Sequence, residues 1–445
     1  MSTESPNRLI SLDVFRGMTI AGMVLVNNPG TWSAIYPPLK HAEWHGITPT
    51  DYVFPFFLFI VGIAVPLALG RRVEAAAGDN DGGGSGGGLS NDIYWKIVKR
   101  AVLIFFLGLF LAAFPFFDYA KSDVPAAAKI AVMMVIPAAL YFWLTSKPII
   151  SLVLLGAVVL AAAGFYFAGY SLFVNNFENL RIMGVLQRIA VCYLIAALIF
   201  LHTNWRQQAI IAGALLLLYW ALMSWIPVPG CEVTTFNDKA CNLAAYLDRT
   251  ILGENHIWRS AKVYDPEGVL STIPAVSTAL AGVLAGQWLR RKTDDYEKVS
   301  GFFFFGVSLL ALGYLWSLAF PINKPLWTSS YVVYTAGLAL CFLGFCYWLI
   351  DIKGCKTWTK PFVIFGVNAL ALYVGSGVMA RILGLIKVSG AGGGAEISLQ
   401  KWIFDTFYLP LAAPINASLV YAVSFILVWL FLMWLLHRKG IYIKV

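Results

Sequence analysis

The sequence contains little charge and few residues of the kinds that soluble enzymes use for chemistry. Only 12% of its 445 residues are Asp, Glu, Lys or Arg, whereas 59% are hydrophobic, and there are five histidines and six cysteines. This composition excludes an ordinary soluble domain and predicts a membrane protein. The sequence also lacks a Gly-Lys-Ser or Gly-Lys-Thr phosphate loop, which excludes a common type of nucleotide-binding loop.

Long apolar runs occupy most of the chain. A bilayer span needs about 20 mostly apolar residues, and by that rule the chain contains about twelve transmembrane helices. The net charge is +9, but the basic residues lie mostly in short loops. Because Lys and Arg are enriched in cytoplasmic loops, their distribution places both termini in the cytoplasm and the loop around His41 outside it. We therefore expect an all-α polytopic membrane protein. We expect it to be embedded in a lipid bilayer and not to bind nucleic acid.

Two polar segments separate apolar runs. Residues 75–92 are rich in Gly and Ser and predict a flexible cytoplasmic linker. Residues 228–268 form a long loop that we place outside the cytoplasm. For Cys231 and Cys241 in this loop we expect a disulfide, because such bonds persist in oxidising compartments. We expect the other cysteines to be free thiols.

The stretch from Arg8 to Gly62 carries the most polar chemistry in an apolar setting. Asp13 and Asn27 lie in or at the edge of its first apolar run, where lipid contact is costly, so we expect them to face protein or water. His41 follows in a polar loop, and an imidazole that titrates near neutral pH can act as a general base. The Asn27 amide can donate a hydrogen bond to a developing oxyanion. We infer that this stretch is the reaction centre.

Several residues of this stretch allow two interpretations. Asp51 can cap the helix that follows the sequence TPTD, or it can orient a histidine, a role that Asp13 can also fill. Lys40 and Trp44 are candidate acceptor contacts. His41 and His45 have a spacing that on a helix suits a metal, but the prolines before them and the glycine after them disfavour a helix, so we expect no metal.

Three further groups of polar residues adjoin apolar runs. Arg181, Gln187 and Arg188 enter the sixth run, where a buried arginine needs an anionic partner, either a protein carboxylate or a ligand phosphate. The second group is Asp265 with Glu267, which can cap a helix or bind the acceptor. The third group is Lys324 with Trp327, which can hold a nucleotide or anchor a helix at the membrane interface.

Six stretches together resemble the heparan-alpha-glucosaminide N-acetyltransferase family of transmembrane acyltransferases, especially its bacterial members. They follow one another in family order along most of the chain: RLISLDVFRG, VLVNN, KHAEWHGITPTDYVFPFFLFIVG, GVLQRIAVCYL, YDPEGVLSTIPA and INKPLW.

The resemblance implies transfer of an acetyl group from acetyl-CoA to the amine of a glucosamine-type sugar. It assigns His41 and Asn27 as catalytic residues, with Asp13 and Asp51 as acidic residues of the same block. Arg188 and Lys324 match basic positions that we expect near CoA in this family. Gln187 and Trp327, close to them in the sequence, are further candidate contacts of the acetyl donor.

Direct attack by the amine, with His41 as base, and a covalent acetyl-histidine are both open. We favour direct attack slightly.

The chain also departs from the family pattern. Residues 118–179 predict an inserted helical hairpin, because relatives have a short connection there. The luminal domain of the animal members is missing, so we expect a free or glycan-linked amino sugar as acceptor. The expected location is a bacterial inner membrane, and the sequence is compatible with a homodimer. A sugar transporter is the alternative function, since it would use the same buried polar residues without bond chemistry.

Overall fold

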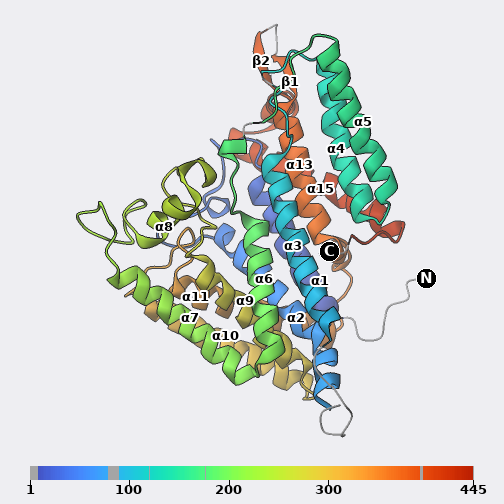
Figure 1. Cartoon of the computed structure of the whole chain (residues 1–445). Helices are drawn as coiled ribbons and strands as arrows, with labels where there is room; N and C mark the ends of the chain where they lie inside the picture. Colours follow the sequence, from blue (N-terminus) through green and yellow to red (C-terminus); the bar gives the residue numbers. More distant parts are fainter. Residues whose placement is uncertain (1–8, 79–89, 120, 176, 391–393, 444–445) are drawn as a thin grey trace. The chain divides into compact units, whose positions relative to one another are not determined.

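Helices make up nearly all of the regular structure in the computed structural model, which describes residues 9–78, 90–119, 121–175, 177–390 and 394–443 (Figure 1). Two compact units divide the chain. The first comprises the described residues within 1–23, 38–109 and 181–366, and the second those within 24–37, 110–180 and 367–445. Most of the predicted linker 75–92 lies outside the described residues.

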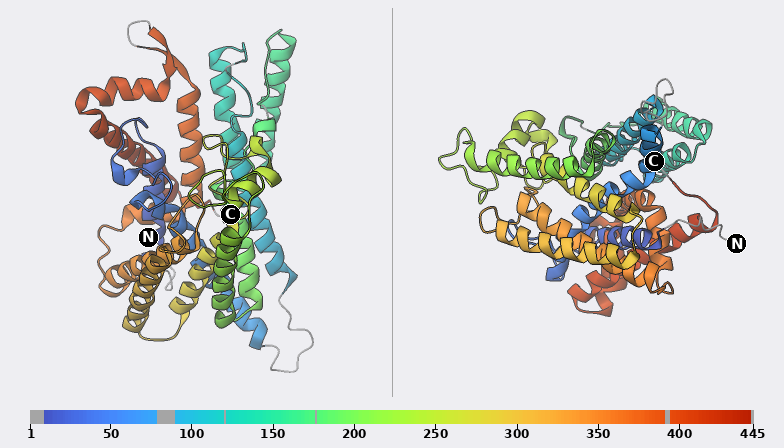
Figure 2. Two further views of the ribbon diagram at one scale, coloured as in Figure 1. Left: turned by 90° about the vertical axis from the view of Figure 1, so that its left-hand side faces the viewer. Right: turned by 90° about the horizontal axis from the view of Figure 1, so that it is seen from below.

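The first unit contains most of the long helices. They are α1 (Ile10–Asn27, which ends in the second unit), α2 (Val53–Gly78), α3 (Asn91–Ala113, mostly in this unit), α6 (Val185–His202), α7 (Trp205–Trp225), α8 (Leu243–Leu252), α9 (Thr272–Arg290), α10 (Asp295–Trp316), α11 (Ser329–Cys346) and α12 (Lys360–Val367). A π-helical turn at Tyr347–Ile352 extends α11. In Figure 2, α10 and α11 are the adjacent pair in yellow and orange.

The protein is an all-α polytopic membrane protein, as the apolar runs predict. Ten described helices are long and apolar enough to span a bilayer, or eleven if α12 and α13 form one broken span. The predicted number was about twelve. The difference is α3, whose N-terminal half carries Lys96, Lys99 and Arg100, so that its apolar part is short for a full span.

Small residues let α2 and α9 cross closely. A Cβ atom added to Gly62 of α2 would lie 2.0 Å from the Ala279 carbonyl oxygen of α9, and one added to Gly282 would lie 2.0 Å from the Phe59 carbonyl oxygen. Small residues at such crossings let backbones approach in membranes, where apolar side chains gain little from leaving lipid. This crossing supports the helices that carry the polar loops described below.

The second unit contains the predicted hairpin and the C-terminal helices. Its elements are α4 (Ala126–Leu144), α5 (Pro148–Phe167), α13 (Ala369–Leu385), β1 (Lys387–Gly390), β2 (Gly394–Ser398), α14 (Leu399–Ile403) and α15 (Pro414–Arg438). Within the predicted hairpin 118–179, α4 and α5 pack against each other as an antiparallel pair. Figure 2 also shows α13 leading into β1 and β2, which pair antiparallel. The glycine-rich sequence of this segment is by itself typical of a loop.

Candidate functional site

His41 lies in an irregular loop between α1 and α2. Short 3₁₀ turns at Pro37–Leu39 and Pro49–Tyr52 flank the loop, and residues 41–48 form no helix. Gly46 has a φ of +101°, a conformation that is strained for residues with a Cβ. The prediction that His41 and His45 do not share a helix face is therefore confirmed.

A buried carboxylate orients the His41 ring. The Nδ1 atom of His41 lies 2.6 Å from Oδ1 of Asp51, whose side chain is 1% exposed. The other oxygen, Oδ2, accepts hydrogen bonds from the backbone N–H of Ala42 (3.1 Å) and from the N–H and hydroxyl of Thr48 (both 3.0 Å). An ionised carboxylate can only accept, so Nδ1 carries the hydrogen and donates it. The lone pair of the neutral ring is then on Nε2.

Asp51 has both of the roles that its sequence position suggested. Its carboxylate binds the N–H groups before the 3₁₀ turn, as a cap does, and it also holds His41. The buried hydroxyl of Tyr331 donates to the Asp51 backbone carbonyl (2.6 Å). Hydrogen bonds thus hold both the side chain and the backbone of Asp51. Because His41 is bonded to this carboxylate, Asp51 also holds the His41 ring in position.

Lys324 contacts the same histidine from a loop 283 residues further along the chain. Its Nζ lies 3.2 Å from Nε2 and 2.9 Å from Nδ1 of His41, and 3.6 Å from Oδ1 of Asp51. Burial lowers the pKa of Lys324, and the negative charges of Asp51 and Glu267 oppose that effect. A group that reacts at Nε2 is therefore within reach of a cation.

Arg188 is buried behind Trp327 with part of its hydrogen-bonding capacity unused. Its guanidinium carbon lies 5.1 Å from the centre of the Trp327 ring. Nη2 donates to the Gly268 carbonyl (3.1 Å) and to the Ser271 hydroxyl. The Nε and Nη1 atoms are buried and have no hydrogen-bond partner. Because buried guanidinium groups are normally saturated with acceptors, these two donors are suited to an anionic or carbonyl group of a ligand.

Arg181 has the anionic partners that we expect for a buried arginine, namely two protein carboxylates. Its Nε and Nη2 bind Oδ2 and Oδ1 of Asp265 (2.8 and 2.5 Å), and Nη2 also binds Glu267. Both carboxylates are buried. They do not cap α9, which begins only at Thr272. Since Arg181 already uses these oxygens, their role as acceptor ligands remains a prediction without further support.

Asp248 supports this acidic turn and was not identified from the sequence. It accepts the backbone N–H groups of Asp265 (3.2 Å) and Val269 (2.9 Å). Burial raises its pKa from 3.8 to about 6. The available signal was a single acidic residue on the amphipathic helix α8, which alone does not reveal a distant partner.

The segment 228–268 packs on the His41 loop. The Trp44 indole N–H donates to the Phe236 carbonyl (2.8 Å), and Nε2 of His45 lies 2.9 Å from Oδ1 of Asn237. A disulfide between Cys231 and Cys241 closes the loop that contains both contact residues, as we expected. Nδ1 of His45 also lies 3.3 Å from Nδ2 of Asn323. Trp44, at 8% exposure, is thus a packing residue, and its acceptor contact remains a prediction.

The remaining predicted residues lie in other surroundings. Asp13 forms an ion pair with Arg16 of the same helix (3.7 Å). Lys40 is exposed, and Gln187 is buried. Asn27 is exposed at the end of α1 and belongs to the second unit, so its place beside His41 remains a prediction.

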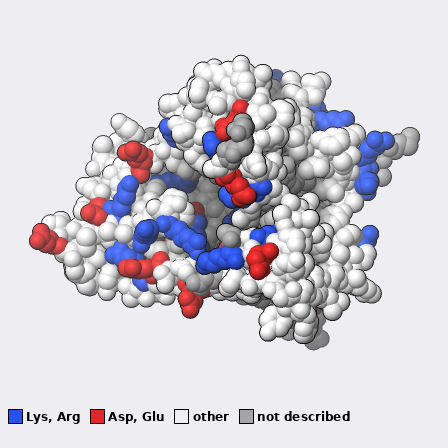
Figure 3. Space-filling view, turned by 90° about the horizontal axis from the view of Figure 1, so that it is seen from above, with Lys and Arg blue, Asp and Glu red and all other residues white. Residues whose placement is uncertain are grey.

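Charged side chains gather on the side of the molecule where α8 lies. Figure 3 shows Lys and Arg mixed with Asp and Glu there, on a face that is otherwise largely uncharged.

Within the described ranges, no group of three or more His, Cys, Asp and Glu side chains is arranged to hold a metal ion.

Comparisons with known proteins identify relatives over most of the chain. The chain is 27% identical over 430 residues to heparan-alpha-glucosaminide N-acetyltransferase of Mus musculus, which covers 84% of this chain and 54% of that protein. The Homo sapiens protein of the same name is 27% identical over 424 residues, covering 83% and 53%. The chain thus spans about half the length of these curated relatives. No protein-family model matches it.

Proposed function

Since the chain belongs to the heparan-alpha-glucosaminide N-acetyltransferase-like family of membrane proteins, we propose that it transfers an acetyl group from acetyl-CoA to the amine of a glucosamine-type sugar. The observation that carries this proposal is the hydrogen bond between His41 and the buried Asp51. It puts the lone pair of the ring on Nε2, where the Lys324 ammonium lies 3.2 Å away and where a substrate amine would take its place. A pure binding site has no need of a histidine whose tautomer is fixed in this way.

His41 acts as a general base in the proposed reaction. Its Nε2 takes a proton from the sugar amine while the nitrogen forms a bond to the acetyl carbonyl carbon. The resulting oxyanion accepts a hydrogen bond from Asn27. The bond between carbon and sulfur then breaks, and His41 returns the proton to the leaving sulfur. The products are the N-acetyl sugar and free CoA, and His41 regains its starting state.

The two cations Lys324 and Arg188 have different proposed roles. The short distance between Lys324 and His41 supports a role for Lys324 at the reacting atoms, where its charge stabilises the oxyanion or the leaving thiolate. We therefore place it at the thioester and not at the CoA phosphates. The unused N–H groups of Arg188 support a place for it in the donor site, where they would bind a carbonyl or phosphate oxygen of the donor.

A transfer assay tests the proposal against the alternative of a sugar transporter. The broken helix pair α12 and α13 is the feature that favours a transporter, because discontinuous helices often form transport sites. Purified protein with labelled acetyl-CoA and glucosamine should form labelled N-acetylglucosamine. Protein in sealed vesicles that accumulates glucosamine saturably and forms no acetylated product would refute the enzyme.

We further propose that the protein lies in a bacterial inner membrane with both termini in the cytoplasm. The alternating apolar spans and the basic loops support this topology. Reporter fusions to the C-terminus should be active on the cytoplasmic side, and activity on the opposite side would contradict it.

A further inference from the structure

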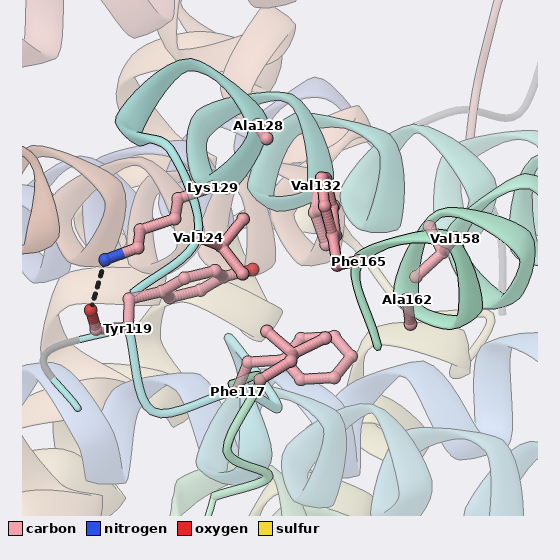
Figure 4. A pocket seen from close by; sticks show the side chains of 10 residues that line it. Phe117, Tyr119, Val124, Ala128, Lys129, Val132, Val158, Ala162 and Phe165 are labelled. Carbon is pink, nitrogen blue, oxygen red and sulfur yellow. Dashed lines mark hydrogen bonds between the residues drawn. The ribbon is translucent and has the colours of Figure 1, made fainter. Parts of the chain in front are cut away.

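A small cavity lies inside the α4–α5 hairpin (Figure 4). It measures about 10 Å³, and Val132, Ala162 and Phe165 contribute to its lining. A cavity of this size holds one water molecule at most, so it is no ligand site. The loop that carries His41 offers more, because its second histidine, His45, has two contacts that the proposed mechanism does not use.

His45 joins the His41 loop to two segments that are distant in the sequence. Its Nε2 lies 2.9 Å from Oδ1 of Asn237, in the loop that the disulfide closes. Its Nδ1 lies 3.3 Å from Nδ2 of Asn323, in the turn that carries Lys324. Protein groups thus occupy both ring nitrogens, and neither is free for a substrate.

These contacts determine which nitrogen of His45 carries the hydrogen. Oδ1 of Asn323 accepts the backbone N–H of Leu326 (2.8 Å), so the NH₂ group of the same amide faces the imidazole. An amide nitrogen only donates, and Nδ1 of the ring is therefore the acceptor. The ring hydrogen is on Nε2, which donates it to Asn237. His45 thus has the tautomer opposite to that of His41.

Asn323 also shapes the turn that presents Lys324. It is fully buried, its backbone N–H donates to the Thr328 hydroxyl (3.0 Å), and its carbonyl accepts the Thr328 N–H (3.1 Å). Trp327 in the same turn has a φ of +52°, in the left-handed region that residues with a Cβ rarely adopt. Such a turn keeps its shape only while its surroundings hold it, and the Asn323 amide is one of the groups that do so.

The turn and the His41 loop meet again at the ammonium of Lys324. This lysine directly follows the buried asparagine, and its Nζ lies 3.2 Å from Nε2 of His41. Next to His45, the backbone N–H of Gly46 donates to the Ile322 carbonyl (2.8 Å). A misplacement of about 1 Å can cost about 10²-fold in rate. The contacts that hold this turn against the His41 loop are therefore expected to affect the rate.

We propose that His45 is a positioning residue for acetyl transfer. By accepting the Asn323 amide hydrogen at Nδ1, it holds the turn so that the Lys324 ammonium lies beside Nε2 of His41. This role rests on the proposed function, because the reaction is the same. His45 touches no substrate and acts through Asn323 and Lys324. The contact of its Nε2 with Asn237 contributes to stability and not to the rate.

Two substitutions each keep one of the two His45 contacts. Asparagine places an oxygen where histidine has Nδ1, so His45→Asn can still accept from Asn323. Glutamine places its amide further out, near the position of Nε2, so His45→Gln can still contact Asn237 but has no acceptor for Asn323. In the acetyl-transfer assay, we expect His45→Gln to lower kcat about fivefold, the effect of one neutral hydrogen bond, with unchanged KM for acetyl-CoA. His45→Asn should retain most of the wild-type kcat. Equal losses in the two variants would contradict the proposal.

A double variant shows whether His45 acts through Lys324. In a Lys324→Met background, His45→Gln should lower kcat no further, because the effects of residues in one chain of contacts do not add. Losses that multiply would refute the role. The control is His202→Gln, which changes a histidine paired with Tyr94 at the end of α6 and should keep full activity. Thermal unfolding identifies a variant that fails to fold, and His45→Leu, which also lacks an acceptor, then replaces His45→Gln.

A measurement without substrate separates this role from the proposed reaction. The chain has five histidines, and nitrogen NMR of protein with isotope-labelled histidine distinguishes the two tautomers of each ring. The signal that is lost in His45→Asn identifies His45. We expect its hydrogen on Nε2, and a hydrogen on Nδ1 would refute the positioning role even in an active enzyme. Wild-type protein that has the expected tautomer but forms no N-acetylglucosamine would refute the proposed function instead.

Discussion

Replacement of Asp51 by Asn probes the His41 ring most selectively, because the two side chains have nearly the same shape. In the native protein, Oδ2 accepts three hydrogen bonds from Ala42 and Thr48 while Oδ1 accepts from Nδ1 of His41. An amide has only one acceptor oxygen. The three donors will hold that oxygen, so the NH₂ group of Asn will face Nδ1.

The His41 tautomer must then change. Nδ1 becomes the acceptor and the hydrogen moves to Nε2, where the lone pair is needed for proton abstraction. General-base catalysis contributes about 10²- to 10⁴-fold, and we expect kcat to fall by that factor. Loss of one charge-assisted hydrogen bond should also cost about 1.5–3 kcal/mol of stability.

Acetyl transfer from labelled acetyl-CoA to glucosamine, measured with thermal unfolding of the same samples, checks both numbers. Asp405→Asn is the control, because Asp405 pairs with the neighbouring Lys401 in a different segment of the chain, and the variant should keep full activity. A folded Asp51→Asn protein with kcat within about threefold of the wild type would refute the assigned tautomer, since that difference is far below the general-base effect.

Three other variants test separate parts of the account. Lys324→Met should lower kcat about 10²-fold with little change in the KM for acetyl-CoA if the lysine acts at the reacting atoms; a rise in KM alone would place it at the phosphates. Asp248→Asn should flatten the dependence of the unfolding temperature on pH. Native Asp248 holds its proton up to about pH 6, so its stabilising contribution is complete below pH 3.8 and lost as the pH rises through about 6; an identical pH profile for the variant would contradict this. Gly62→Ala would put a Cβ 2.0 Å from a carbonyl oxygen of α9 and should destabilise by about 1–3 kcal/mol or more. Gly156→Ala on α5, where a Cβ meets nothing within 4 Å, is its control, and equal unfolding temperatures for the two would contradict the close crossing.

The membrane spans could be predicted because the physical signal is local. A run of about 20 apolar residues is long enough to cross the bilayer wherever it occurs. The bridge between Cys231 and Cys241 could be expected for a similar reason, because both cysteines lie in one polar loop that the spans place outside the cytoplasm. The short pairing of β1 with β2 escaped prediction, because the glycine-rich sequence around it is typical of a loop.

The contacts of the candidate site could be predicted only in part, because they join distant segments. Asp51 was a candidate partner of His41 from the same loop, and their hydrogen bond fits that expectation. Lys324 was expected at CoA, and nothing in its own loop indicates that it lies 3.2 Å from the His41 ring. The pairing of Arg181 with Asp265 likewise depends on how α6 and α9 pack.

Loss of acetyl transfer on replacement of His41 by Ala is the most direct test of the central claim. His41 is half exposed, so the variant should fold, and its unfolding temperature should stay close to that of the wild type. His437→Ala, at the end of α15, should retain full activity. The account predicts that the purified His41→Ala protein forms no labelled N-acetylglucosamine above background. A well-folded variant that acetylates glucosamine at the wild-type rate would contradict it.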